Sequence, residues 1–143
     1  MGQIVIAYYS ESGNTEQMAG IVAKGVEAAG GEAKVVTVDQ VTADDLKAET
    51  VFALGCPALG EEELEADTVE PLTAEIEGFA AGKKIGLFGS YGWGDGEWMR
   101  LWVDRLTKAG AEVLGGEDAI CTDAPDDEAE AKLMELGKKL ASA

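Results

Sequence analysis

Residues 10–15 hold the side chains of this sequence that are best suited to binding an anion. They follow an apolar run over residues 4–9 and read Ser10, Glu11, Ser12, Gly13, Asn14 and Thr15. A helical pattern begins directly after them, and the first N–H groups of a helix lack intrahelical acceptors and lie at the positive end of its dipole. Hydroxyl and amide groups add donors, and a glycine lets the backbone close around a ligand. Because the first basic residue is Lys24, this loop would bind a phosphate group through uncharged donors.

An ordinary tight turn between a strand and a helix uses the same residue types. In that interpretation Asn14 or Ser12 is a plain N-cap, and nothing binds at the loop. Short loops of glycine and serine match binding motifs by chance, so residues 10–15 alone leave both interpretations open. The loop lacks the Gly-Lys-Ser/Thr ending of a Walker loop and does not match Gly-x-Gly-x-x-Gly.

The loop over residues 57–67 contains five acidic residues and no basic one. A run of acids is usually a solvated surface or a set of favourable charges at the N-terminus of the next helix. We favour that interpretation for Glu65 and Asp67. Leu59 and Gly60 differ, because both lie where a ligand at the end of a strand would lie.

The loop over residues 90–97 places Trp93 between Gly92 and Gly94. Its ring has few local side chains to pack against, so we predict a stacking platform for a flat ligand; the alternative is a ring folded onto its own loop. Trp98 and Trp102 lie at helical spacing and are predicted to pack in or on the core. A phosphate loop without basic residues beside an aromatic ring suits FMN better than ATP, whose phosphates need Mg²⁺ or cationic side chains.

Strand and helix patterns alternate along the chain. Apolar runs predict strands over residues 4–9, 33–38, 50–56, 84–90 and 112–121, with a possible break in the last at Gly115 and Gly116. Helical spacing predicts helices over residues 18–29, 42–46, 69–79, 99–109 and 129–140, with Pro125 in the first turn of the last. This alternation predicts an α/β fold with a parallel sheet and helices on both faces. Ligands of such sheets bind beyond the C-terminal ends of the strands, so the loops after the first, third and fourth strands should form the site.

The composition is that of a globular protein with a large excess of acid. The 143 residues predict one domain over 1–143, and 28 acidic against 11 basic residues give a net charge of −17 with no histidine. Nucleic acids and anionic membrane surfaces are therefore excluded as partners, and a basic protein surface is favoured.

Cys56 and Cys121 each end an apolar run, which favours buried free thiols over a disulfide. Nothing in the sequence suggests a metal cluster. No apolar run reaches membrane length and the first residues do not resemble a leader, so we expect a cytoplasmic protein.

The three loops together resemble those of the flavodoxin family, and the resemblance covers essentially the whole chain. Residues 10–15 resemble the family's Ser-x-Thr-Gly-Asn-Thr pattern, and residues 54–60 and 87–99 resemble the two flavin loops of short-chain, clostridial-type members. The resemblance implies three layers around a five-stranded parallel sheet in the order 2-1-3-4-5, an order known for flavodoxin. It also implies a monomeric, low-potential one-electron carrier, not an enzyme, with non-covalently bound FMN that cycles between semiquinone and hydroquinone.

The resemblance also implies which residues contact FMN. The phosphate would be held by residues 10 and 12–15 with Ser90, and the ring would lie between Leu59 and Trp93. Glu62 would accept a hydrogen bond from flavin N3–H, and the carbonyl of the Gly60–Glu61 peptide would turn toward N5–H on reduction. The complete set of expected contacts is Ser10, Glu11, Ser12, Gly13, Asn14, Thr15, Pro57, Ala58, Leu59, Gly60, Glu61, Glu62, Ser90, Tyr91, Gly92, Trp93 and Gly94.

Three departures from the family pattern lie within this set. Many relatives have Met at the position of Leu59, which loses a sulfur contact and keeps apolar stacking. Some have Ser at the position of Pro57, which cannot donate a hydrogen bond. Glu11 lies inside the phosphate loop, so we expect its carboxylate to point to solvent.

The acidic residues around the expected ring site have two consequences. Glu61, Glu62 and Glu63 would oppose a second negative charge on the flavin, so the second electron should enter at a lower potential than the first. The same charges should attract redox enzymes with basic docking surfaces. The expected partners are ferredoxin or flavodoxin reductases, other oxidoreductases and hydrogenase-type acceptors.

Two other functions use a similar scaffold. A small FMN-dependent reductase of quinones or nitro compounds would take hydride from NAD(P)H, but 143 residues leave little room for a nicotinamide pocket. A signalling receiver domain would need acids after the first strand and an aspartate after the third, where this chain has Ser10 and Pro57.

Overall fold

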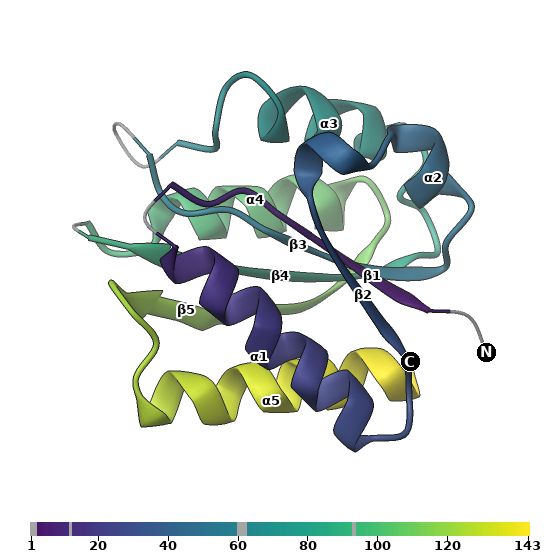
Figure 1. Ribbon diagram of the computed structural model, residues 1–143. Helices are drawn as coiled ribbons and strands as arrows, with labels where there is room; N and C mark the ends of the chain where they lie inside the picture. The colour runs from purple at the N-terminus through teal and green to yellow at the C-terminus, as the bar shows by residue number, and fades with distance from the viewer. Residues whose placement is uncertain (1–2, 12, 60–62, 93) are drawn as a thin grey trace.

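The computed structural model describes residues 3–11, 13–59, 63–92 and 94–143, and within them five parallel strands form one sheet (Figure 1). The strand order is β2-β1-β3-β4-β5, which confirms the order that the resemblance implied. The strands are β1 (Ile4–Tyr8), β2 (Ala33–Thr37), β3 (Val51–Gly55), β4 (Lys84–Tyr91) and β5 (Glu112–Thr122).

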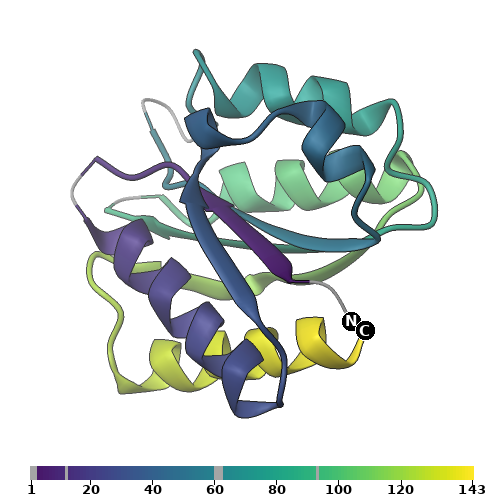
Figure 2. The same ribbon diagram turned by 45° about the vertical axis from the view of Figure 1, so that its right-hand side comes forward.

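Helices cover both faces of the sheet and complete three layers (Figures 1 and 2). One face packs against α1 and α5, and the other packs against α2, α3 and α4. Within the described residues the α-helices are α1 (Asn14–Ala28), α2 (Ala43–Lys47), α3 (Val69–Glu77), α4 (Glu97–Lys108) and α5 (Asp127–Ser142), with a 3₁₀ turn over Val38–Gln40.

The central strands are buried on both faces, as their unbroken apolar sequences predict. Along β1, Ile6 packs toward α1 and α5, and its neighbour Ala7 packs toward α3 and α4. In β3, Ala53 likewise packs toward α1 and α5, and Phe52 packs toward α3 and α4. Successive side chains of a strand point to opposite faces, so each strand contributes to two hydrophobic cores. Trp98 and Trp102 are fully buried in the core on the α3 and α4 side, which confirms the prediction for both.

Two predicted features of the last strand and helix need correction. β5 is continuous through Gly115 and Gly116, which have φ of 77° and 69° and form an irregularity in its pairing with β4. Glycine accommodates this because a Cβ on Gly115 would lie 2.8 Å from the carbonyl oxygen of Leu87. Pro125 precedes α5 instead of lying in its first turn, because Asp126 is the N-cap and its carboxylate accepts from Ala129 N–H at 2.9 Å.

α1 and α5 approach each other backbone to backbone. A Cβ on Gly25 would lie 2.2 Å from the carbonyl oxygen of Met134, and one on Gly137 would lie 2.1 Å from that of Val22. The two glycines therefore allow α5 to lie directly against α1, whose N-terminus carries the first loop. Among the described residues, no helix has both the length and the apolar character that a membrane crossing requires.

Candidate functional site

Four loops meet at the C-terminal edge of the sheet and enclose a cavity of about 280 Å³. Three are the predicted loops after β1, β3 and β4, and the fourth follows β5. The lining residues are Glu11, Asn14, Pro57, Ala58, Leu59, Ser90, Tyr91, Gly92 and Asp123. Eight of these nine residues belong to the predicted set, and the strand order explains their convergence, because β1, β3 and β4 are neighbours.

The first loop leaves the first two N–H groups of α1 available to a ligand. Gly13 is the N-cap of α1, with φ of 93° and no side-chain cap, so Asn14 is not the plain N-cap of the alternative interpretation. Ser10 Oγ accepts from the N–H groups of Gly13 at 3.1 Å and Glu16 at 3.4 Å. The N–H groups of Asn14 and Thr15 are the first of the helix and have no intrahelical acceptor. With its side chain free of capping, Asn14 lines the cavity.

A buried pair of hydroxyl groups joins the first loop to the end of β4. Thr15 is 1% exposed and Ser90 is 4% exposed, and their oxygens lie 3.1 Å apart, although 75 positions separate them in the sequence. One hydroxyl donates to the other, which leaves the second hydroxyl hydrogen for another acceptor. The structure thus brings together uncharged donors from two loops beside the positive end of α1, as a phosphate site without basic residues requires.

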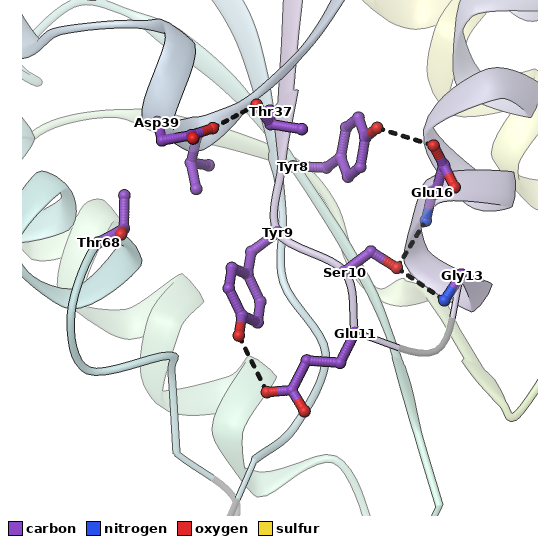
Figure 3. Close-up of a pocket in the computed structure, with 10 residues that line it drawn as sticks. Tyr8, Tyr9, Ser10, Glu11, Gly13, Glu16, Thr37, Asp39 and Thr68 are labelled. Atoms are coloured by element: carbon purple, nitrogen blue, oxygen red, sulfur yellow. Dashed lines mark hydrogen bonds between the residues drawn. The ribbon is translucent and has the colours of Figure 1, made fainter.

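Glu11 is exposed and its carboxylate accepts from the Tyr9 hydroxyl at 2.9 Å. Figure 3 shows this pair at a second hollow of about 570 Å³, on the β2 side of the first loop. The Tyr8 hydroxyl donates to Glu16 at 3.0 Å in the same hollow, and Thr37 bonds to Asp39. The pKa of Tyr9 is raised mainly by its bond to Glu11, and that of Tyr8 by burial and then by Glu16. Glu11, Glu16 and Asp39 give this hollow three carboxylates, against two, Glu11 and Asp123, in the cavity described above, so it is the less suited of the two to a phosphate.

The loop after β3 is held at both ends. Leu59 and Glu63 exchange two backbone hydrogen bonds of 3.0 and 2.8 Å, which fixes the entrance and exit of the segment between them. The Glu65 carboxylate, 8% exposed, accepts from the N–H groups of Asp67, Thr68 and Val69 at 2.8 to 3.0 Å. Burial alone would raise the pKa of Glu65, but these donors outweigh it and lower the pKa. Glu65 therefore supports the N-terminus of α3, as predicted, and Asp67 is exposed.

The loop after β4 rests on an aromatic pair beneath it. Tyr91 ends β4 and lines the cavity, and its ring centroid lies 5.5 Å from that of Trp98. The Trp98 indole N–H donates to the carbonyl oxygen of Cys56 at 3.1 Å, so the same ring also supports the end of β3. Gly92 is open toward the cavity, because a Cβ there would meet only Asp123 Oδ1 at 3.8 Å.

Asp123, in the loop after β5, was missed from the sequence. It lines the cavity, and its N–H donates to the Tyr91 carbonyl oxygen at 2.9 Å. Its φ of 59° lies in the left-handed region, which aspartate tolerates better than most residues. The sequence did contain a signal for it, because the loop after a fifth parallel strand reaches the same edge of the sheet as the loops after the first, third and fourth strands.

The remaining predicted contacts divide into two groups. Ser10 and Gly13 lie at the first loop and line the neighbouring hollow, and Gly94 is exposed in the turn before α4. Ser12, Gly60, Glu61, Glu62 and Trp93 lie outside the described residues.

Both cysteines are buried free thiols, as predicted. Burial raises the pKa of Cys56 to about 12 and that of Cys121 to about 11, so both stay protonated near neutral pH. Among the described residues, no group of three His, Cys, Asp or Glu side chains could hold a metal ion.

Comparison with known proteins agrees with this geometry. Residues 6–136 match the model of the flavodoxin family. The chain is 45% identical to a flavodoxin from Megasphaera elsdenii over 98% of this chain and 99% of that one, and 43% identical to one from Clostridium beijerinckii over 96% and 98%. The solution structure of two-electron reduced Megasphaera elsdenii flavodoxin superposes with a TM-score of 0.90 at 43% identity, over 99% of this chain and all of that one.

Proposed function

We propose, from the premise that this chain belongs to the flavodoxin family, that the cavity between the loops after β1, β3, β4 and β5 is its FMN site. The protein is an FMN-binding electron carrier and not an enzyme. When bound, FMN supplies the ability to take up and release electrons singly. The protein's own residues bind and orient the cofactor and set the charge around it.

The phosphate is assigned to the N-terminus of α1. The N–H groups of Asn14 and Thr15 and the Asn14 amide would donate to it, together with the hydroxyl hydrogen that the Thr15–Ser90 pair leaves over. Ser10 holds this turn in place through its bonds to Gly13 and Glu16, and acts on the phosphate only indirectly. The buried Thr15–Ser90 pair is the observation that carries the proposal, because it joins two distant loops through the donors that a phosphate needs.

The flavin ring is assigned to the other end of the cavity. Pro57, Ala58, Leu59 and Tyr91 provide its apolar and aromatic lining among the described residues. For Trp93, Gly60, Glu61 and Glu62, we propose the roles that the family resemblance implies. These are stacking by Trp93, a turning carbonyl between Gly60 and Glu61, and a carboxylate of Glu62 that accepts from N3–H. The acids would disfavour the second electron more than the first.

The proposed partners are redox enzymes with basic surfaces, and the proposed state is a monomer formed by one FMN-binding domain over residues 1–143. The net charge of −17 supports this choice of partner, since opposite charge speeds encounter. The alternative, an NAD(P)H-dependent reductase, is not favoured, because flavodoxins match this chain over nearly its whole length.

The phosphate assignment is tested by comparing FMN with riboflavin, which lacks the phosphate. Apoprotein is titrated with each, and flavin fluorescence quenching gives the dissociation constants. Replacing both hydroxyls in Thr15→Val/Ser90→Ala should weaken FMN binding roughly tenfold or more and leave riboflavin binding nearly unchanged. Equal losses for both ligands would show that the pair supports the fold alone, and absence of FMN binding by the unaltered protein would overturn the proposed function.

A further inference from the structure

A groove of about 420 Å³ lies between α3, α4 and the segment before α3, outside the FMN cavity. Its apolar lining residues include Leu64, Leu101 and the buried Trp98 and Trp102. Leu101 is 54% exposed, although it lies on a helix whose other large apolar side chains are mostly buried. Among the described residues, only Val35 is another large hydrophobic side chain that is exposed, at 41%. An exposed leucine within an apolar groove is typical of a surface that a partner covers.

The rim of the groove is acidic. Glu63, Glu70 and Asp104 lie around it, against one basic residue, Arg105. The Arg105 guanidinium is already paired within the chain, with Glu70 at 2.6 Å and Glu77 at 2.7 Å. Asp104 also lies 2.9 Å from Lys108 Nζ, so four carboxylates, counting Glu77, face two cations around the groove. This local excess of negative charge, on a chain of net charge −17, favours a positively charged partner.

The groove and the FMN cavity share structural elements. Leu59 lines the cavity and Glu63 lines the groove, and two backbone hydrogen bonds join these residues. Tyr91 lines the cavity and Trp98 lines the groove, and their ring centroids lie 5.5 Å apart. A protein seated in the groove would thus be separated from the cavity by the Leu59–Glu63 backbone pair and the Tyr91–Trp98 ring pair.

We propose that this groove, centred on Leu101, is the docking surface for a basic redox protein. The partner covers Leu101 with an apolar side chain and places Lys or Arg side chains against the acidic rim. Docking there brings the partner's redox centre close to the flavin; one electron leaves this protein, one enters the partner's oxidised centre, and no bond changes. The inference rests on the proposed function and adds the location and chemistry of the partner.

The test compares Leu101→Lys with Val35→Lys. Both substitutions change the net charge equally at an exposed hydrophobic residue, so long-range attraction changes equally in both. Val35 pairs with Ile6, whose side chain packs toward α1 and α5, so it lies on the face opposite to α3 and α4. Oxidised cytochrome c, a basic haem protein, serves as the electron acceptor from reduced, FMN-loaded protein in stopped-flow experiments at low ionic strength.

Leu101→Lys should lower the second-order rate constant roughly tenfold, and Val35→Lys less than about twofold. Leu101→Ala, compared with Val35→Ala, removes the apolar contact without a change of charge and should lower the rate constant in the Leu101 variant only. The affinity for FMN and the reduction potentials are measured first in every variant and should match those of the unaltered protein. If the affinities and potentials match and the Leu101 and Val35 variants give equal rate constants, the docking surface is overturned and the FMN site stands. Failure of the unaltered protein to bind FMN would overturn the proposed function itself.

Discussion

Glu65 is a buried carboxylate whose charge is matched by backbone donors and not by a basic side chain. Three N–H groups at the start of α3 donate to it, and the loop that it closes includes Leu59, which lines the proposed FMN cavity. At the residue scale, this one side chain links the position of the loop after β3 to the stability of α3.

We expect Glu65→Gln to lower the free energy of unfolding at pH 7 by roughly 1–2 kcal/mol, because hydrogen bonds to a charged acceptor are stronger than those to an amide. The pKa of Glu65 is lowered in the folded state from its ordinary value of 4.5. Its stabilisation is therefore fully present above that value and is lost as the pH falls through the lower folded pKa.

Urea denaturation of both proteins between pH 3 and 7 measures this difference. Glu75→Gln, at an exposed position of α3, has the same change of charge and serves as the control. A difference between Glu65→Gln and the unaltered protein that stays constant down to the lowest pH would contradict the charged hydrogen bonds.

At the scale of elements, the contact between α1 and α5 decides how the first loop is supported. Glycine is a poor helix former, yet Gly25 and Gly137 lie inside these two helices. They allow the backbones of α1 and α5 to approach closely, since a Cβ on either would overlap a carbonyl oxygen of the other helix. Gly20, also inside α1, has open space where its Cβ would be.

Gly137→Ala should therefore destabilise the fold by roughly 2–4 kcal/mol, because the helices must separate, and this outweighs a gain of about 1 kcal/mol in helix propensity. Gly20→Ala should instead stabilise the fold by about 0.5–1 kcal/mol. Chemical denaturation of the two variants measures both values. Stabilisation by both substitutions would mean that α1 and α5 are not in backbone contact.

At the scale of the whole molecule, the net charge of −17 both attracts partners and opposes folding. Like charges held together in a compact chain repel one another, and salt screens that repulsion. The ion pairs among the described residues neutralise only part of this charge, and most of them are exposed.

Raising NaCl from 10 to 200 mM should accordingly increase the free energy of unfolding, because the screening length falls from about 30 Å to below 10 Å. The same change should slow electron transfer to a basic acceptor. Choline chloride at equal ionic strength should have the same effect on stability, which would separate screening from specific binding of sodium. A stability that is independent of salt would show that the acids are arranged without net repulsion.

Most of the fold could be predicted because the signals are local. Continuous apolar runs predicted the strands, including β1, β3 and β4, which are buried on both faces, and helical spacing predicted the helices. The boundaries of strands and helices were predicted less accurately where a glycine or a proline can either break an element or fit within or beside it. Gly115 and Gly116 suggested a break but accommodate an irregular pairing, and Pro125 suggested a helical turn that begins only after Asp126.

The candidate site was predicted through loop composition and the rule that loops of a parallel sheet meet at one edge. By itself the sequence determined which residue types stand at that edge, because turn chemistry and strand periodicity depend on near neighbours. Only the tertiary structure decided that Ser10 braces the first turn, that Thr15 bonds to Ser90, and that Asp123 completes the cavity. These contacts join residues far apart in the chain, and no local pattern records which distant partner a side chain will meet.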